Sequence, residues 1–146
     1  MVCGFAFHGD ETLLIKKKRG PDVVRGKLNG IGGHIEKSRG ETPIQAMVRE
    51  FAEEAGAATR EDLWVRFVEF HFDGGCVHYF FYDGDPPQVR TMTDESVFWT
   101  SRFTVQEALV RDLTWLIPLA RHIRGTSIEV PIVIREETTE LATERI

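Results

Sequence analysis

The chain has 146 residues, 42% of them hydrophobic, which is enough for one domain with a buried core. Its 18 basic and 23 acidic residues give a formal net charge of −5, which argues against stable binding to nucleic acids. Two cysteines are too few for a disulfide framework and favour a reducing compartment. The apolar run at residues 2–7 lacks the features of a signal peptide, and no segment approaches the roughly 20 apolar residues of a membrane helix. We therefore expect one cytoplasmic domain over residues 1–146, a monomer or a homodimer without membrane contact.

Short apolar runs bounded by turn residues predict strands, and longer runs with helical periodicity predict helices. In chain order, the predicted strands are a hairpin of residues 2–7 and 12–17, a short strand near Ile31, and strands at 63–72, 76–82, 97–100 and 128–134. Helices are predicted between Thr42 and Gly56, at 105–110 and at 114–124, and an acidic tail occupies about 136–146. Pro131 places the last strand at an edge or a bulge. This order predicts an α/β fold in which helices cover both faces of a mixed sheet.

The ends of the first helix carry specific signals. Thr42 suits the N-cap, Gln45 follows it at the spacing of a capping box, and Pro43 suits the first helical position. Gly56 supplies the C-terminal stop. At about 100° per residue, an apolar stripe of this helix faces the core; it consists of Ile44, Met47, Val48, Phe51 and Ala55.

Three carboxylates lie on an adjoining face of the same helix. Glu50, Glu53 and Glu54 are spaced i, i+3 and i+4, so their like charges repel one another. Glutamates ordinarily form a solvated face, but such a face usually mixes charges, and here the nearest helical cation is Arg49. A guanidinium at that position suits holding a carboxylate in place. We therefore interpret this face as a site for Mg²⁺, which prefers oxygen ligands.

Residues 33–57 resemble the Nudix box, in which Gly, five residues, Glu and seven residues precede Arg-Glu-(apolar)-x-Glu-Glu-x-Gly-(apolar). Every position from Glu41 to Ala57 fits this pattern. Seven residues instead of five separate Gly33 from Glu41, and we assign the two additional residues to the surface loop at 37–39, where growth costs little. The resemblance implies an α/β/α sandwich with a mixed sheet.

The resemblance also implies a set of metal ligands. Glu53 and Glu54 would bind Mg²⁺, or Mn²⁺ in its place, together with the carbonyl of Gly33. Glu50 would ligate the ion, or orient and deprotonate the attacking water. Glu95 is a further candidate ligand, because relatives recruit an acidic residue from the region before the next strand.

Two supporting residues follow from the same pattern. Arg49 would hold one of the glutamates in place, and Glu41 would support the site from the start of the helix. The resemblance does not identify the catalytic base, because Nudix relatives differ in the glutamate that deprotonates the water.

Residues 26–33 resemble the corresponding stretch of MutT-like enzymes that hydrolyse oxidised purine nucleoside triphosphates. In those relatives an asparagine at the position of Asn29 hydrogen-bonds the base, for which an amide is suited because it both donates and accepts. The alternative is a turn residue before glycine. Lys27 belongs to a basic cluster at residues 16–27, which would dock a polyanion or protect a strand edge.

Residues 111–119 resemble a segment of vertebrate-type oxidised purine triphosphatases in which two adjacent aspartates face the base. Asp112 matches one of these aspartates, and Arg111 replaces the other. Alternatively, Asp112 caps the helix that follows it. Four aromatic residues are candidates either for stacking on a base or for the core: Trp115, Phe70, Phe72 and Phe80.

Three of the five histidines are candidates for a ligand contact. His71 and His78 flank the turn at 73–75, where we expect no metal because facing histidines in a hairpin need none and no cysteine lies at ligand spacing. His34 follows two glycines and is a candidate for a phosphate contact.

The resemblance implies a Mg²⁺-dependent pyrophosphohydrolase whose substrate is a nucleoside triphosphate, an oxidised purine nucleotide among the candidates, and whose role is to cleanse the nucleotide pool. One alternative is a hydrolase of another nucleoside diphosphate-linked substrate, such as a sugar nucleotide or a dinucleoside polyphosphate. The other is a catalytically silent module that binds a nucleotide. All three helical glutamates and Arg49 are present, which favours an enzyme.

Overall fold

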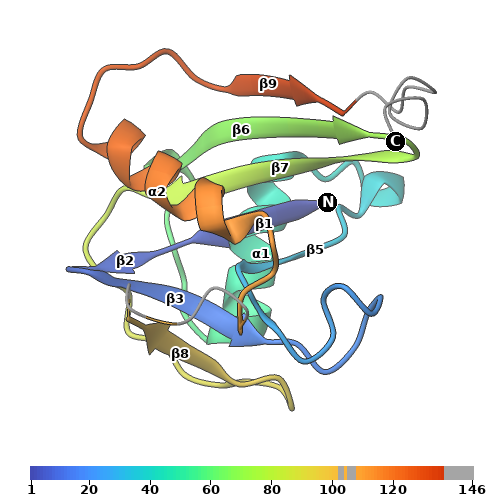
Figure 1. The fold of residues 1–146 in the computed structure, drawn as a ribbon, viewed down its shortest axis with the longest axis vertical. Helices are drawn as coiled ribbons and strands as arrows, with labels where there is room; N and C mark the ends of the chain where they lie inside the picture. The colour runs from blue at the N-terminus through green and yellow to red at the C-terminus, as the bar shows by residue number, and fades with distance from the viewer. Residues whose placement is uncertain (102–103, 105–107, 137–146) are drawn as a thin grey trace, which may run out of the picture.

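The computed structural model describes residues 1–101, 104 and 108–136, which form two sheets and two α-helices (Figure 1). The five-stranded sheet has the order β5 (Ile31–Gly33), β1 (Val2–Phe5), β7 (Gly75–Tyr82), β6 (Trp64–Phe72) and β9 (Ile132–Arg135). The second sheet is built on β3 (Glu11–Lys16), which pairs with β2 (Phe7–His8), β4 (Leu28–Asn29) and β8 (Val97–Thr100). The pairs β1–β7 and β6–β9 are parallel and the others are antiparallel, so the prediction of a mixed sheet is confirmed.

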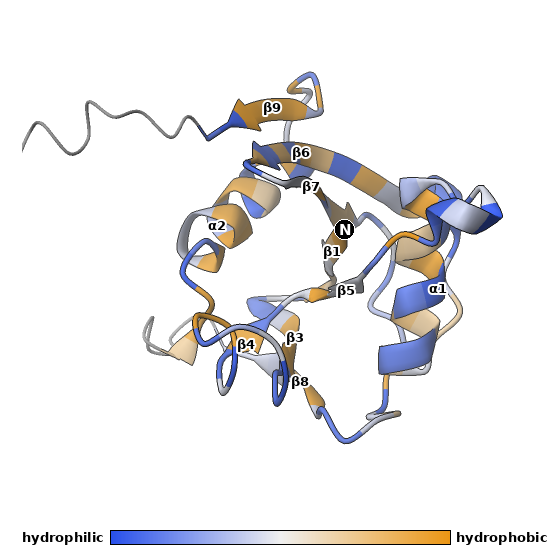
Figure 2. Cartoon of the chain, turned by 90° about the vertical axis from the view of Figure 1, so that its right-hand side faces the viewer, coloured by the Kyte–Doolittle hydropathy of each residue, from blue (hydrophilic) through white to orange (hydrophobic). Residues whose placement is uncertain are grey.

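The two α-helices cover opposite faces of the five-stranded sheet (Figure 2). On one face, α1 (Pro43–Ala55) buries its apolar stripe, including Met47 and Phe51, against Trp64 and Phe80. On the other, α2 (Leu113–Arg124) packs with Phe5 and Phe67. Two short 3-10 helices, η1 (Lys37–Arg39) and η2 (Glu61–Leu63), lie on either side of α1 in the chain. This arrangement confirms the α/β/α sandwich. Neither helix within the described residues combines the length and the apolar character that crossing a bilayer requires.

The N-terminal strand differs from the predicted hairpin. The chain divides at Ala6, whose carbonyl accepts a hydrogen bond from Leu13 N–H (2.9 Å). Before this point β1 lies between β5 and β7, and after it only β2 pairs with β3. Residues 2–7 are all buried, so their sequence has no alternation that distinguishes a central strand from one arm of a hairpin.

The C-terminal elements are shorter or later than predicted. The last strand is β9 rather than 128–134, and it lies at an edge of its sheet, as Pro131 predicted. Half of the predicted helix at 105–110, residues 105–107, lies outside the described residues; within the described half, Leu109 forms an isolated bridge with Leu28. The acidic tail lies outside the described residues apart from Glu136.

Candidate functional site

The ends of α1 are those that the sequence predicts. Gln45 N–H donates to Thr42 Oγ1 (3.3 Å), and Thr42 N–H donates to Gln45 Oε1 (3.0 Å), which completes the capping box. Gly56 ends the helix in the left-handed conformation, with φ of 68°. Because both ends are specified locally, the bounds of α1 are fixed by its own sequence, and burial of its apolar stripe against the sheet then sets the direction of its glutamates.

The three glutamates of α1 lie in different environments. The Glu50 side chain is 12% exposed, Glu54 is partly buried, and Glu53 is 58% exposed. Gly33 lies directly against Glu50, because a Cβ at Gly33 would stand 2.3 Å from Glu50 Oε1. Only glycine at this position lets the backbone of β5 approach the carboxylate so closely. The structure therefore brings together Gly33 and Glu50, two of the candidate metal ligands.

Arg49 joins the carboxylates. Its Nε and Nη2 donate to the two oxygens of Glu41 (2.7 and 2.9 Å), and its Nη1 donates to Glu50 (3.0 Å) and Glu53 (3.2 Å). Nη2 also donates to the carbonyl of His34 (2.9 Å). These bonds lower the pKa of Glu41 to about 2 and raise that of Arg49. One guanidinium thus ties α1 to the loop that precedes it.

The loop between Gly33 and Glu41 contains the additional residues. Lys37–Arg39, the segment to which we assign them, forms the 3-10 turn η1, and Gly40 follows with φ of 71°. Glu36 N–H donates to Glu41 Oε1 (2.9 Å), so the loop closes on the carboxylate that Arg49 holds. His34 contributes its carbonyl to this network, and its side chain is exposed.

Of the two α1 glutamates with a raised pKa, Glu54 and Glu50, Glu54 is the more strongly affected. Burial and the neighbouring Glu50 raise its pKa to about 7, against the opposite effect of Lys17. Burial also raises the pKa of Glu50, although Arg49 acts in the opposite direction. Within the described residues, Glu54 Oε2 is the one buried side-chain oxygen or nitrogen that has no hydrogen-bond partner. A buried acceptor without a donor is costly unless a further group binds it.

Glu95 is held differently from the α1 glutamates. It is 5% exposed, and its Oε1 forms an ion pair with Lys17 Nζ (2.9 Å). Its Oε2 accepts hydrogen bonds from the backbone N–H groups of Lys18 (2.7 Å) and Arg19 (3.4 Å). Burial raises the pKa of Glu95, but these donors outweigh it and the net pKa is lowered. Both oxygens of Glu95 therefore have protein partners. Lys17, whose charge lowers the pKa of Glu54, is a further candidate residue of this site, which the sequence analysis placed only in the general basic cluster.

The donors around α1 fit a hard divalent cation. Glu50, Glu53 and Glu54 offer carboxylate oxygens, β5 offers its backbone beside them, and Glu54 Oε2 is buried without a partner. Mg²⁺ and Mn²⁺ take oxygen ligands of this kind, and either would relieve the repulsion among the three glutamates.

Asn29 lies at the end of β4. Its Oδ1 accepts hydrogen bonds from Gly30 N–H (2.8 Å) and, more weakly, from the thiol of Cys3 (3.8 Å). Within the described residues its amide nitrogen makes no hydrogen bond, so its donor side is available to a ligand. The turn interpretation and the base-contact interpretation of Asn29 thus concern different atoms of one side chain.

Asp112 occupies the N-cap position of α2 but makes no capping hydrogen bond, so the proposed cap is wrong. Its Oδ1 instead accepts from the indole Nε1 of Trp115 (3.2 Å), because the backbone of Asp112 is already helical. The Trp115 ring lies 6.4 Å from that of Phe70. Burial together with the nearby Cys3 and Asp112 raises the pKa of Tyr79. Tyr79 is opposite Cys3 in the β1–β7 pair, and Cys3 contacts Asn29. The sequence analysis did not single out Tyr79, because it appeared as one of many strand aromatics.

The remaining aromatic candidates separate by burial. Phe80 is 2% exposed and belongs to the core, whereas Phe72 is 37% exposed near the β6–β7 turn.

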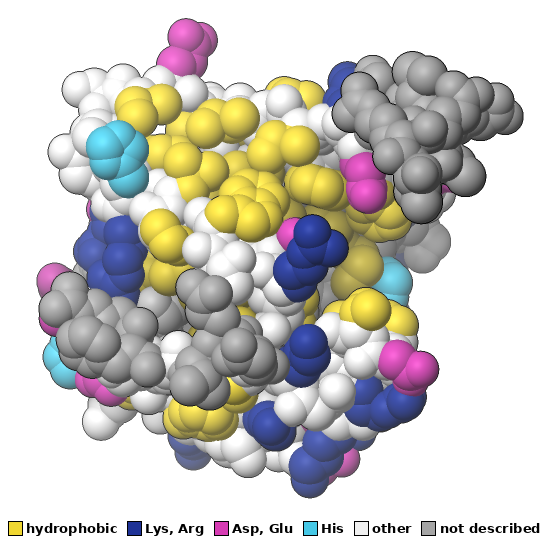
Figure 3. Space-filling model, in the orientation of Figure 1, with side chains coloured by type: hydrophobic (Ala, Val, Ile, Leu, Met, Phe, Trp, Pro, Cys, Tyr) yellow, Lys and Arg dark blue, Asp and Glu magenta, His cyan; other side chains and the backbone are white. Residues whose placement is uncertain are grey.

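Lys27 lies in the loop after β3, where Lys and Arg side chains gather on the face shown in Figure 3. In this loop Arg19 pairs with Asp94, and Arg25 pairs with Asp22. The basic cluster is thus partly neutralised by its own carboxylates.

The two histidines of the β6–β7 hairpin do not face each other, contrary to the premise of the sequence analysis, because His78 is opposite Glu69 and His71 is opposite Cys76. Cys76 Sγ lies 4.0 Å from His71 Nε2 and 3.8 Å from His78 Nε2. The premise that no cysteine lies at ligand spacing is therefore wrong, because spacing along the sequence does not show which residues face one another across a hairpin.

A cavity of about 240 Å³ lies away from the carboxylates, between β3, β8 and α2. Its lining is mainly apolar and includes Leu14, Leu109, Leu113 and Ile117. It contains none of the α1 glutamates, so charge and donor chemistry place the candidate reaction centre at α1 and not at this cavity.

The sequence matches the family model of the NUDIX domain over residues 2–122. The chain belongs to the Nudix family. Among similar solved structures is the NUDIX domain of Shewanella oneidensis NrtR complexed with ADP ribose, at a TM-score of 0.66 and 19% identity, with 86% of this chain and 85% of that chain covered. A MutT mutator protein from Bacillus halodurans has a TM-score of 0.62 and 18% identity, with 94% and 89% covered.

A third similar structure is a bifunctional NMN adenylyltransferase/ADP ribose pyrophosphatase from Francisella tularensis, complexed with AMP and a Mn ion. The TM-score is 0.64 and the identity 20%, over 85% of this chain. The chain spans only 41% of that larger protein. At these identities the likeness shows that this Nudix chain shares their fold.

Replacing Glu54 with Gln should stabilise the metal-free protein at alkaline pH. Between pH 4.5 and about 7 the unfolded chain ionises at this residue while the folded chain keeps its proton, so stability falls as pH rises through this window. The variant removes that cost, which is on the order of 2 kcal/mol after allowance for solvent screening. Urea denaturation with a chelator present, at pH 4 and pH 8, should show a gain at pH 8 only. Glu53→Gln, at an exposed position, is the control; an equal gain at both pH values would contradict the assignment.

Replacing Arg49 with Lys should destabilise the protein by about 2 kcal/mol, because an ammonium cannot reproduce the two-pronged contact with Glu41. The control is Arg39→Lys, since Arg39 is 78% exposed and, among the residues that the structure describes, forms an ion pair with Glu36 only. The free energies of unfolding of the two variants are compared by denaturant titration. Similar losses in both would show that the Arg49 network contributes no more than a surface pair.

Proposed function

We propose that this Nudix chain is a Mg²⁺-dependent pyrophosphohydrolase that cleaves a nucleoside triphosphate to the monophosphate and pyrophosphate. The observation that carries the proposal is the cluster of carboxylates on α1 and just before it. One guanidinium orders Glu41, Glu50 and Glu53, while a buried oxygen of Glu54 is left for a cation. Family membership supports hydrolysis of a pyrophosphate bond in general. We propose further that residues 1–146 act as one domain, as a monomer or a homodimer.

In this proposal Glu53, Glu54 and the Gly33 carbonyl hold the metal, which when bound neutralises phosphate charge and activates water. Glu50 orients that water and takes its proton. Its raised pKa supports this role, because a base works best when its pKa approaches the working pH. Arg49 fixes the direction of Glu50, so the carboxylate meets the water in one orientation.

Glu95 takes a supporting role in this scheme. It was a candidate ligand, but its two oxygens hold Lys17 and the backbone of the loop after β3. We propose that Glu95 positions Lys17 beside Glu54, where the ammonium offsets carboxylate charge and faces the substrate phosphates. Lys27, in the same loop, adds positive charge for the triphosphate.

We propose that the nucleobase of the substrate binds near Asn29, Asp112 and Trp115. The free amide donor of Asn29 and the carboxylate of Asp112 offer a donor and an acceptor for a purine edge. Trp115 donates to Asp112 and so fixes its direction. With Arg111 in place of a second aspartate, recognition of an oxidised purine would rest on one carboxylate.

A second candidate is a nucleoside diphosphate-linked substrate. It is favoured by the two similar structures described as an ADP ribose complex and as an ADP ribose pyrophosphatase. The two candidates differ in their products, since a triphosphate releases pyrophosphate whereas ADP ribose releases two monophosphates. A silent nucleotide-binding module is the third possibility, and it predicts binding without any cleavage.

The purified chain is incubated with Mg²⁺ and a panel of triphosphates, oxidised purine triphosphates, ADP ribose and sugar nucleotides, and the products are separated. We expect pyrophosphate and a monophosphate. Glu53→Gln and Glu54→Gln should each lower turnover by several orders of magnitude, because each removes a carboxylate charge from the metal site. Arg39→Lys should leave turnover unchanged. Full activity of both Gln variants would refute the metal assignment, and nucleotide binding without cleavage would favour the silent module.

Replacing Asn29 with Ala should change the preference among bases more than the dependence on Mg²⁺. The alanine removes the free donor and leaves the α1 carboxylates in place. Values of kcat/KM for purine and pyrimidine triphosphates, measured over a Mg²⁺ series, test this. Equal losses on every base would show that Asn29 serves the turn alone.

A further inference from the structure

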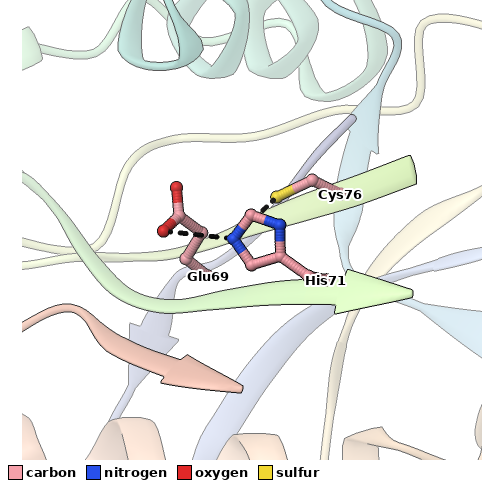
Figure 4. Close-up of side chains that lie close together, drawn as sticks. All are labelled: Glu69, His71 and Cys76. Carbon is pink, nitrogen blue, oxygen red and sulfur yellow. Dashed lines mark hydrogen bonds and ion pairs between the residues drawn. The ribbon is translucent and has the colours of Figure 1, made fainter. Parts of the chain in front are cut away.

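A second group of metal-ligating side chains lies on the β6–β7 hairpin, outside the site on α1. In this antiparallel pair Glu69 is opposite His78, and His71 is opposite Cys76. Directly opposed residues point to the same face of a sheet, and so do residues two apart on one strand. All four side chains therefore project from one face of the hairpin, as Figure 4 shows for Glu69, His71 and Cys76.

The distances among these side chains approach those of a metal centre. Glu69, His71 and Cys76 each offer one ligand atom, and the three atoms lie within 4.8 Å of one another. His71 Nε2 is 3.3 Å from Glu69 Oε2 and 4.0 Å from Cys76 Sγ. Tetrahedral Zn²⁺, with bonds of about 2.0–2.1 Å to N or O and about 2.3 Å to S, requires separations of about 3.3 and 3.5 Å. Small side-chain rotations would close the remaining gap.

The backbone holds these residues on rigid elements. The carbonyl of His71 accepts from Glu136 N–H (2.8 Å), so its strand is paired on both sides, with β7 and β9. The N-terminal ammonium donates to the carbonyl of Cys76 (3.0 Å). The three side chains are partly buried, which leaves an entry route for an ion while limiting competition from water.

His78 lies beside this group under a constraint of its own. Its Nε2 is 3.8 Å from Cys76 Sγ, but Arg66 Nη1 lies 3.3 Å from its Nδ1. Since a guanidinium only donates, this contact makes Nδ1 the acceptor and puts the proton of the neutral ring on Nε2, toward Cys76. His78 would need the other tautomer to bind an ion through Nε2, so it is not one of the primary ligands.

We propose that Glu69 Oε2, His71 Nε2 and Cys76 Sγ form a binding site for a divalent transition metal ion of the Zn²⁺ class, with the His78 ring beside its fourth position. A thiolate, an imidazole and a carboxylate together favour Zn²⁺ or Co²⁺ over Mg²⁺, which takes oxygen ligands. Binding releases the thiol proton of Cys76 and places the positive ion against Glu69. The site is independent of the proposed hydrolase, because none of its ligands lies on α1.

The test is a Co²⁺ titration of the full, chelator-treated chain in excess Mg²⁺, which occupies oxygen sites and competes poorly for sulfur. We expect about one Co²⁺ per chain and a thiolate-to-cobalt charge-transfer band. Cys76→Ser should abolish the band, and His71→Gln or Glu69→Gln should weaken binding at least about tenfold. Zn²⁺ should displace Co²⁺ and raise the Tm of the wild type but not of Cys76→Ser. His78→Gln should weaken binding less than His71→Gln.

Two controls separate this site from others. Cys3→Ala removes the other thiol and should keep the band, and His122→Gln removes an exposed histidine of α2 and should keep the affinity. Cobalt binding without a charge-transfer band, or an unchanged band in Cys76→Ser, would overturn the proposal. If Cys76→Ser loses its fold, as judged by circular dichroism without metal, His71→Gln and Glu69→Gln decide the matter, and wild-type affinity in both would overturn it.

Discussion

The Arg49 guanidinium is the interaction on which the carboxylate site depends. Five hydrogen bonds from this one side chain reach Glu41, Glu50, Glu53 and the carbonyl of His34. Without them, three like charges within one turn and a half of helix would repel one another into solvent. The same bonds fix the loop after β5 to the helix, so the glycine backbone and the glutamates keep their relative positions even though that loop is two residues longer than in the family pattern.

Arg49 offsets only part of the negative charge of the carboxylates, and the charge that remains indicates what the site is suited to bind. Glu41 is fully compensated, as its lowered pKa shows, whereas burial of Glu54 leaves an oxygen without a donor. A chain selected only for stability would place a hydrogen-bond donor or an apolar side chain there. Lys17 lowers the pKa of Glu54 only in part, because its ammonium forms an ion pair with Glu95. Stability given up at one carboxylate is what a site for a cation and a polyphosphate is expected to show.

Local signals determine how much the sequence predicts. The bounds of α1 follow from Thr42, Pro43 and Gly56, because capping is decided within one helical turn. The family resemblance then predicts that Gly33 lies close to the glutamates. Residues 2–7 fail as a hairpin arm because every position is buried, so periodicity carries no information. Asp112 fails as a cap because its backbone is already helical, so its carboxylate accepts from the indole of Trp115 instead. The approach of Cys76 to two histidines follows from strand register, which local composition does not determine.

The two candidate metal sites would sort ions by ligand chemistry and not by size. The α1 site offers oxygens alone, and its buried, partly uncompensated charge favours a strongly hydrated ion that also binds phosphate. The hairpin offers sulfur, nitrogen and one oxygen, a set that Mg²⁺ does not fill. Zn²⁺ also binds carboxylates, so in a chain without the hairpin site it would compete with Mg²⁺ for the α1 site. A thiolate site on another element would bind Zn²⁺ more tightly and would therefore take up this ion first at low concentrations. The ligand types of the two sites therefore allow both to be filled in one chain without exchange of their ions.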